Sequence, residues 1–152
     1  PLKQHYDYIL IDCPPSLGML TINALSAADN ILIPVQAQYL PAKGMTKLLN
    51  TISKVKHQIN PKVDILGVAI TLANMQTNLG KSTVDTIREN YGKHIKVFNS
   101  IIPIGVKAAE ASVSGKSVYQ HAKDSNVAKA YEDLTKEIRK IERSKHKGTP
   151  ER

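Results

Sequence analysis

Residues 6–35 read YDYILIDCPPSLGMLTINALSAADNILIPV and set the expected fold. Residues 6–12 predict a strand, because their middle is continuously apolar, as in strands covered on both faces. Two consecutive prolines then end it. Apolar residues recur at helical spacing over 17–28 and predict a helix, and residues 30–35 predict a second buried strand. A strand, a helix and another strand in succession are typical of α/β proteins.

The remainder of the chain continues this alternation. We therefore expect an α/β fold with a mostly parallel sheet flanked by helices. A polar tail over residues 144–152 is expected to fray. The apolar periodicity and the turn residues predict strands over 63–72 and 95–102, and helices over 41–59, 77–91, 106–113 and from 124 or 125 onward.

Composition narrows the class of protein. The 152 residues suit one domain, and the polar start predicts that no signal peptide is present. The single cysteine excludes a disulfide framework and fits a reducing cytosol. The net charge is +8, with −2 on residues 1–40 and +10 on the rest. A basic surface favours a polyanionic partner, although any single lysine is more often simply solvated.

The carboxyl ends of the predicted strands are the expected binding edge, since ligands of open α/β sheets bind there. Asp12 ends the first strand, and an acid at this place matches the carboxylate with which P-loop NTPases help to hold Mg²⁺. A strand-end Asp is more often a turn or a helix cap, because its side chain bonds nearby backbone amides. The other strand ends are residues 34–36, 72–74 and 102–105.

Longer motifs connect the chain with a known family. The motifs are DCPPSLG at 12–18, ILIPVQ at 31–36, a helix with Gly44 and Leu48-Leu49, then Ile101-Ile102-Pro103, Val106-Lys107, Glu110-Ala111 and Gly115-Lys116. In these motifs and their order, residues 1–143 closely resemble the ParA/Soj chromosome- and plasmid-partitioning ATPases. Members of that family are P-loop NTPases with a deviant glycine-rich loop.

The resemblance implies an ATP- and Mg²⁺-dependent homodimer in the bacterial cytoplasm, associated with the nucleoid. Such a dimer binds DNA non-specifically, and a ParB-type centromere-binding partner stimulates its hydrolysis of ATP. Asp12 would help to hold Mg²⁺ through a water. Asn74, Pro103 and Val106 lie where the family forms its adenine pocket, with ordinary loop structure as an equal alternative. The candidates for DNA contact, each of which is also typical of a solvated cation, are Lys81, Arg88, Lys107 and Lys116.

The chain departs from the family pattern at the glycine-rich loop, Lys-Gly-Gly-x-Gly-Lys-Thr, whose amides cradle phosphates. In the family this loop, and the acidic motif that carries a catalytic Asp, precede the Asp12 strand, and neither is among these 152 residues. The chain therefore resembles the C-terminal part of such an ATPase, and no catalytic residue is assigned. We expect this chain alone neither to bind ATP tightly nor to hydrolyse it. Gln76 and Ile104 also stand where the family often has arginines.

Two apparent sites are set aside. Gly80-Lys81-Ser82-Thr83 looks like the end of a phosphate loop, but Met75 stands where that loop needs glycine. The stretch is therefore expected to form the first turn of a helix. Cys13 is expected to be a small buried residue. The five histidines show no metal-binding spacing.

Two other functions stay open. A non-enzymatic interaction or DNA-binding domain without a phosphate loop fits the same residues. A MinD-like membrane-cycling ATPase fits less well, because Ile141 is the only large apolar residue of 139–152. A phosphate-loop motif encoded in frame upstream of Pro1 would favour the ATPase. Open sheet edges also predict edge-to-edge pairing between copies of the chain.

Overall fold

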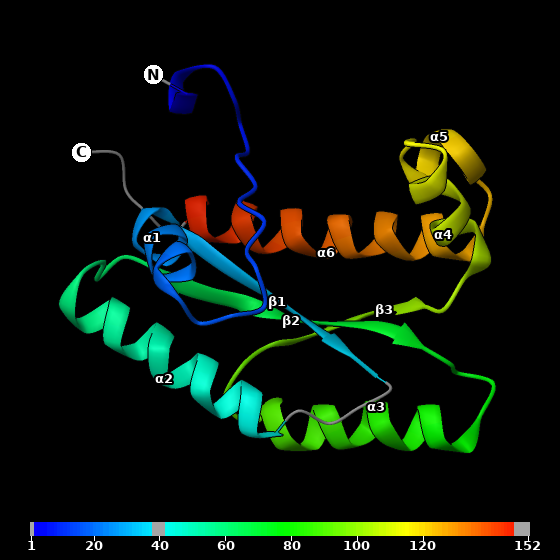
Figure 1. Cartoon of the computed structure of the whole chain (residues 1–152), viewed down its shortest axis with the longest axis horizontal. Coiled ribbons are helices and arrows are strands. Elements are labelled where there is room, and N and C mark those ends of the chain that lie inside the picture. The colour runs from blue at the N-terminus through cyan, green and yellow to red at the C-terminus, as the bar shows by residue number, and fades with distance from the viewer. Residues whose placement is uncertain (1, 38–41, 148–152) are drawn as a thin grey trace. The chain divides into compact units, whose positions relative to one another are not determined.

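The computed structural model describes residues 2–37 and 42–147 (Figure 1). The chain divides into two compact units. Among the described residues, the first unit contains residues 2–31 and 42–64, and the second contains residues 32–37 and 65–147. Each unit is described by itself.

A parallel three-stranded sheet is the centre of the fold, as predicted. Its strands are β1 (Asn30–Gln36), β2 (Asp64–Ala73) and β3 (Val97–Pro103), in the order β1-β2-β3. The β2–β3 pair is parallel, with Val68 opposite Val97, Ile70 opposite Ile101 and Ala73 opposite Pro103. Figure 1 shows the three arrows pointing the same way, so the carboxyl ends of the strands share one edge.

In the second unit, helices α3 (Asn78–Tyr91) and α6 (Asn126–Lys147) lie on opposite faces of the sheet (Figure 1). On the α3 side, Val84 and Ile87 are buried, as are Val68 and Ile70 of β2. The core on the α6 side consists of Leu66 and Ala69 from β2, Phe98 and Ile102 from β3, and Val127 and Leu134 from α6.

Gly67 allows β2 and β3 to approach closely beside this core. Its φ is 156°, and a Cβ added there would lie 2.7 Å from Cε2 of Phe98 and 2.9 Å from the carbonyl oxygen of Lys96. A side chain at position 67 would therefore displace either the buried Phe98 ring or the start of β3. The close packing of Phe98 and Lys96 thus explains why a glycine interrupts the apolar pattern of this strand.

Two short helices follow β3. Helix α4 (Val106–Val113) has the predicted bounds, whereas α5 (Val118–Ala122) was not predicted. A capping box begins α5: the Ser117 side chain accepts from the amide of Gln120, and the Gln120 side chain accepts from the amide of Ser117. The Ser-x-x-Gln pattern was therefore a usable signal for a helix start.

The first unit contains η1 (Leu2–Gln4), α1 (Met19–Ala27) and α2 (Ala42–Gln58). Asn60, just after α2, ties this helix to the end of α1. Its side-chain amide donates to the carbonyl oxygens of Leu25, at 3.2 Å, and Ala28, at 2.8 Å. Since one side chain satisfies two carbonyls at a helix end, it stabilises the connection more than an exposed polar contact would.

The strand predicted over residues 6–12 is wrong. The structure has irregular backbone there, and Leu10 is 93% exposed. A buried strand needs a hydrogen-bonded neighbour on at least one side, and within the described residues this segment pairs with no strand of the sheet. Cys13 is exposed as well, so the prediction of a buried thiol is also wrong.

At the other end of the chain, α6 continues to Lys147, beyond the predicted start of the frayed tail at residue 144. Residues 148–152 of that predicted tail lie outside the described residues. Among the helices that the structure describes, none is long and apolar enough to cross a membrane.

Candidate functional site

The carboxyl ends of β2 and β3 bring two of the predicted nucleotide-contacting residues together. Ala73 pairs with Pro103 in the sheet, and the amide of Ile104 donates to the carbonyl oxygen of Ala73 at 3.1 Å. Asn74 directly follows Ala73, and Val106 begins α4 just beyond Ile104. Asn74 and the segment from Pro103 to Val106 therefore form adjacent parts of one edge, where an open α/β sheet binds its ligands.

Hydrogen bonds hold Asn74 in a defined conformation. Its Oδ1 accepts from the amide of Gln76 at 3.2 Å, and its carbonyl oxygen accepts from the Thr77 hydroxyl at 3.1 Å. These bonds use the oxygen of the Asn74 amide group and leave its Nδ2 without a hydrogen bond to any residue that the structure describes. The amide nitrogen is therefore a donor that is available to a ligand.

Helix α3 begins directly against this turn. Thr77 is its N-cap, and the Thr77 hydroxyl accepts from the amide of Gly80 at 3.0 Å. A Cβ at Gly80 would lie 1.9 Å from the carbonyl oxygen of Asn74, so position 80 must be glycine for the helix to start this close. The Gly80-Lys81-Ser82-Thr83 stretch is thus a helix start in contact with Asn74, and the prediction of a first helical turn is confirmed.

Apolar side chains accompany Asn74 at this edge. Leu72, Met75, Ile104 and Val106 are between 39% and 72% exposed. Leu72 has a φ of 51°, in the left-handed region, which costs a non-glycine residue about 1 kcal/mol or more. An amide donor beside exposed apolar side chains is suited to a flat aromatic heterocycle with ring-nitrogen acceptors.

Asp12 lies in the other unit, in the irregular segment that precedes α1, and is exposed. Its carboxylate is chemically suited to Mg²⁺, which prefers oxygen ligands and keeps several waters. The described residues contain no group of three or more His, Cys, Asp or Glu side chains that could hold a metal ion together. Within the described residues, Asp12 is therefore a carboxylate outside any such cluster.

The four cations predicted to contact DNA differ in their surroundings. The Arg88 guanidinium donates to the carbonyl oxygen of Asn99 at 3.3 Å, and the Lys107 ammonium pairs with Glu110 at 2.9 Å. Lys81 lies in the first turn of α3, and Lys116 follows α4; both are exposed. Arg88 and Lys107 thus have protein partners that a DNA phosphate would have to share or replace.

Glu110 joins Lys107 to α5. Its Oε2 lies 2.9 Å from both the Lys107 ammonium and Nε2 of His121. The hydrogen bond to His121, together with the one to Lys107, lowers the pKa of the Glu110 carboxyl below its usual value. The carboxylate therefore stays charged and neutralises part of the positive charge at the start of α4.

Glu137 of α6 is a structural residue that the sequence did not indicate. Its carboxylate accepts from the amide of Asn99 at 3.1 Å, from the amide of Ser100 at 2.7 Å and from the Ser100 hydroxyl. Partial burial raises the pKa of the Glu137 carboxyl, but the hydrogen bonds from Ser100 and Asn99 outweigh it, and the net pKa is lowered. The charged side chain satisfies donors on the free edge of β3, a common protection against edge-to-edge pairing.

Comparisons with known proteins support the predicted family. A family model described as an AAA domain matches residues 1–65. The chain is 42% identical over 137 residues to the sporulation initiation inhibitor protein Soj of Bacillus subtilis, covering 90% of this chain and 53% of that protein. It is 39% identical over 140 residues to the chromosome partitioning protein ParA of Myxococcus xanthus, covering 92% of this chain and 49% of that protein.

A solved structure supports the fold. Cobyrinic acid a,c-diamide synthase from Mycobacterium smegmatis, with bound ATP analog and magnesium, superposes with a TM-score of 0.70 at 31% identity, over 86% of this chain and 46% of that one. The predicted P-loop NTPase-like α/β fold is thereby confirmed. The chain spans about half the length of the curated relatives that it matches. The predicted resemblance is confirmed, and the chain is a homologue of the ParA/Soj partitioning proteins over about nine-tenths of its length.

Proposed function

We propose that this protein acts in DNA segregation, as the C-terminal part of a ParA-type ATPase domain over residues 1–143. The observation that carries the proposal is the identity of 36–42% to Soj and ParA proteins over about 90% of the chain. In the complete ATPase, ATP and Mg²⁺ drive formation of a homodimer that binds DNA non-specifically in the cytoplasm, on the nucleoid. A ParB-type protein that binds the centromere stimulates hydrolysis.

The carboxyl edge of β2 and β3 is the proposed binding place of the adenine base. Nδ2 of Asn74 would donate to a ring nitrogen, and the side chains beside Pro103 and Val106 would cover a face of the base. Asp12 would hold a water of Mg²⁺. The phosphates need a glycine-rich cradle that these 152 residues do not contain, so no hydrolytic step is assigned to them.

Nucleoside titration followed by NMR tests the base site. Adenosine should shift the amide signals of Asn74 and Ile104 at millimolar concentration, and Asn74→Ala should remove these shifts. Asn90→Ala, which changes an exposed asparagine at the far end of α3, is the matched control and should leave them unchanged. Equal shifts in the Asn74→Ala protein would contradict the site. Measured ATP turnover by the chain would contradict the expectation that it is inactive alone.

Binding to duplex DNA tests the second half of the proposal. The complete ATPase should bind two unrelated duplexes with equal, weak affinity, and the affinity should fall steeply as salt is added, because phosphate contacts release counterions. Lys81, Arg88, Lys107 and Lys116 are the proposed contacts. An affinity that depends on the base sequence or is insensitive to salt would contradict non-specific binding.

The alternative is an interaction domain that does not use ATP. The codons upstream of Pro1 distinguish the two: an in-frame Lys-Gly-Gly-x-Gly-Lys-Thr motif supports the ATPase, and its absence supports the interaction domain.

A further inference from the structure

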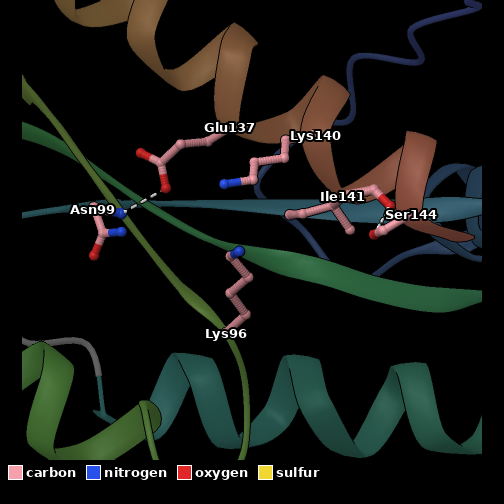
Figure 2. A pocket seen from close by; sticks show the side chains of 6 residues that line it. All are labelled: Lys96, Asn99, Glu137, Lys140, Ile141 and Ser144. Carbon is pink, nitrogen blue, oxygen red and sulfur yellow. Dashed lines mark hydrogen bonds between the residues drawn. The ribbon is translucent and has the colours of Figure 1, made fainter.

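A shallow pocket of about 310 Å³ lies between β3 and α6. Its lining residue Asn99 accepts a hydrogen bond from Arg88, one of the predicted DNA contacts, through its carbonyl oxygen. Lys96, just before β3, contributes one wall, and Lys140 of α6 contributes another. Figure 2 shows the ammonium groups of these two lysines pointing toward the middle of the pocket, from opposite sides. The complete lining is Lys96, Asn99, Glu137, Lys140, Ile141 and Ser144.

The carboxylate in the pocket is already committed to the protein. Both oxygens of Glu137 accept from donors of Asn99 and Ser100 on the edge of β3. Lys96 favours the charged form of Glu137 through space, but no hydrogen bond joins them among the described residues. Three hydrogen bonds from β3 thus use most of the acceptor sites of this carboxylate. With two ammonium groups and one carboxylate, the lining has a formal charge of +1.

The lysines of α6 differ in whether they have acidic partners. Lys136, one turn before Lys140, pairs with Glu132 at 2.9 Å and Asp133 at 3.3 Å. Lys140 has no such partner among the residues that the structure describes. Arg139 and Arg143, on the same helix, are exposed but do not line the pocket.

The positive charge of the pocket favours a negatively charged oxyanion over a neutral polar ligand. Two converging ammonium groups supply up to six N–H donors to a phosphate, and charge-assisted hydrogen bonds to phosphate are the strong ones. The pocket is open to solvent on one side, so it admits a phosphate that is part of a polymer backbone. It contains no aromatic side chain on which a nucleobase could stack.

We propose that Lys96 and Lys140 together bind one backbone phosphate of duplex DNA. The proposal rests on the DNA binding proposed above and adds a contact in the β3–α6 pocket to the four cations named there. Lys96 and Lys140 act as positioning contacts that carry no base information, in keeping with non-specific binding.

Salt-dependent binding of a 24-base-pair duplex, measured by fluorescence anisotropy, tests the site. Lys96→Gln with Lys140→Gln should weaken binding about tenfold and reduce the slope of log K against log salt by about 0.9, the loss of one phosphate contact. Lys96→Arg with Lys140→Arg keeps the charge and should restore most of the affinity. Lys123→Gln with Lys129→Gln removes the same charge near the start of α6 and should change the slope by less than half as much.

The possible outcomes distinguish failure of the pocket proposal from failure of the proposed function. If the unmodified protein binds duplex but both glutamine pairs weaken it equally, the pocket is not a contact, and only this inference fails. If the unmodified protein binds no duplex at low salt, the DNA half of the proposed function fails with it. Inorganic phosphate that shifts the Lys96 and Lys140 signals, with DNA binding unaffected by the substitutions, would overturn the DNA assignment in favour of a free anion. Thermal melting of each variant checks that the fold is retained.

Discussion

The turn from Asn74 to Gly80 follows an apolar run that predicts a strand, and the segment from Tyr6 to Gly18 begins with one, yet the two segments fold differently. The first is held by hydrogen bonds from Gln76, Thr77 and Gly80 within a few residues. In the second, the apolar side chains are exposed and the backbone is irregular. The difference teaches that a turn can be stabilised by its own residues, whereas a buried strand requires a neighbouring strand that its own residues cannot supply.

Adding one carbon at Gly80 should give the largest effect of the substitutions within the two compared segments. Gly80→Ala places a Cβ within 1.9 Å of the carbonyl oxygen of Asn74, and backbone cannot rotate away as a flexible side chain would. The free energy of unfolding should fall by about 3 kcal/mol, measured by urea denaturation. Gly18→Ala is the matched control, because its Cβ would find only Oγ of Ser16 at 3.8 Å. Equal losses of unfolding free energy in the two variants would contradict the close contact between position 80 and Asn74.

Removing the charge of Glu137 tests how much the contacts between α6 and β3 contribute to the free energy of unfolding, compared with the local contacts of the turn from Asn74 to Gly80. Glu137→Gln replaces an acceptor oxygen by a donor nitrogen that faces the donors of Asn99 and Ser100. This should cost about 1–2 kcal/mol of unfolding free energy at pH 7. Glu89→Gln, at an exposed position on α3, should cost almost nothing.

The lowered pKa of Glu137 predicts that its contribution to the stability of the protein decreases at acidic pH. Because the folded pKa of Glu137 lies below its usual value of 4.5, its stabilisation is present above that value and is lost as the pH falls through the folded pKa. The difference in stability between the unmodified protein and Glu137→Gln should therefore shrink below about pH 4.5. A difference that grows on acidification would show that the carboxylate is not stabilised by the β3 donors.

Loss of the α3 cap should have a smaller effect. Thr77→Ala removes the oxygen that accepts from Gly80 and donates to Asn74, and should cost about 1 kcal/mol. Thr86→Ala removes a hydroxyl that bonds within the same helix, to Ser82, and should be neutral or slightly stabilising. Hydrogen exchange at Gly80 and Lys81 would locate the loss at the first turn. A cap substitution without effect would mean that packing alone holds the start of α3.

The smallest effect is expected in the exposed segment. Leu10→Ala should change the unfolding free energy by less than about 0.5 kcal/mol, because Leu10 is 93% exposed. Leu134→Ala, at a leucine that is 6% exposed in the core beside β3, should cost about 2–5 kcal/mol. A large loss from Leu10→Ala would show that the segment is packed in solution, as the sequence had predicted.

Local signals accounted for most of the correct predictions. The cap and glycine around α3 predicted its start and end, and α4 has the predicted bounds, because capping and turn conformations are decided within a few residues. At the candidate site, the strand-end rule selected Asn74 and Pro103, and the sheet register places Ala73, the residue before Asn74, opposite Pro103. Their contact with a nucleotide stays a prediction. The Ser117–Gln120 capping box would have revealed α5 had it been used.

Contacts between distant residues could not be predicted in this way. Nothing in the residues around Glu137 indicates that it binds β3, 37 and 38 positions earlier in the chain. The hydrogen bond from the Arg88 guanidinium to the carbonyl oxygen of Asn99 likewise gives one predicted DNA contact a protein partner on β3. Each depends on the packing of an element against the sheet, which a pattern of apolar residues does not specify in detail.

The sequence by itself determined the α/β class, the order of the elements from β1 onward, the excess of positive charge after residue 40 and the family, because periodicity, turn residues and motifs are local properties. Only the tertiary structure decided that residues 6–12 form no strand, that Glu137 closes the edge of β3, and that Lys96 and Lys140 point into one pocket. These features depend on which chain segments meet. Hydrogen-bond donors, acceptors and charges act over a few ångströms, so their partners are set by the packing and not by their spacing in the sequence.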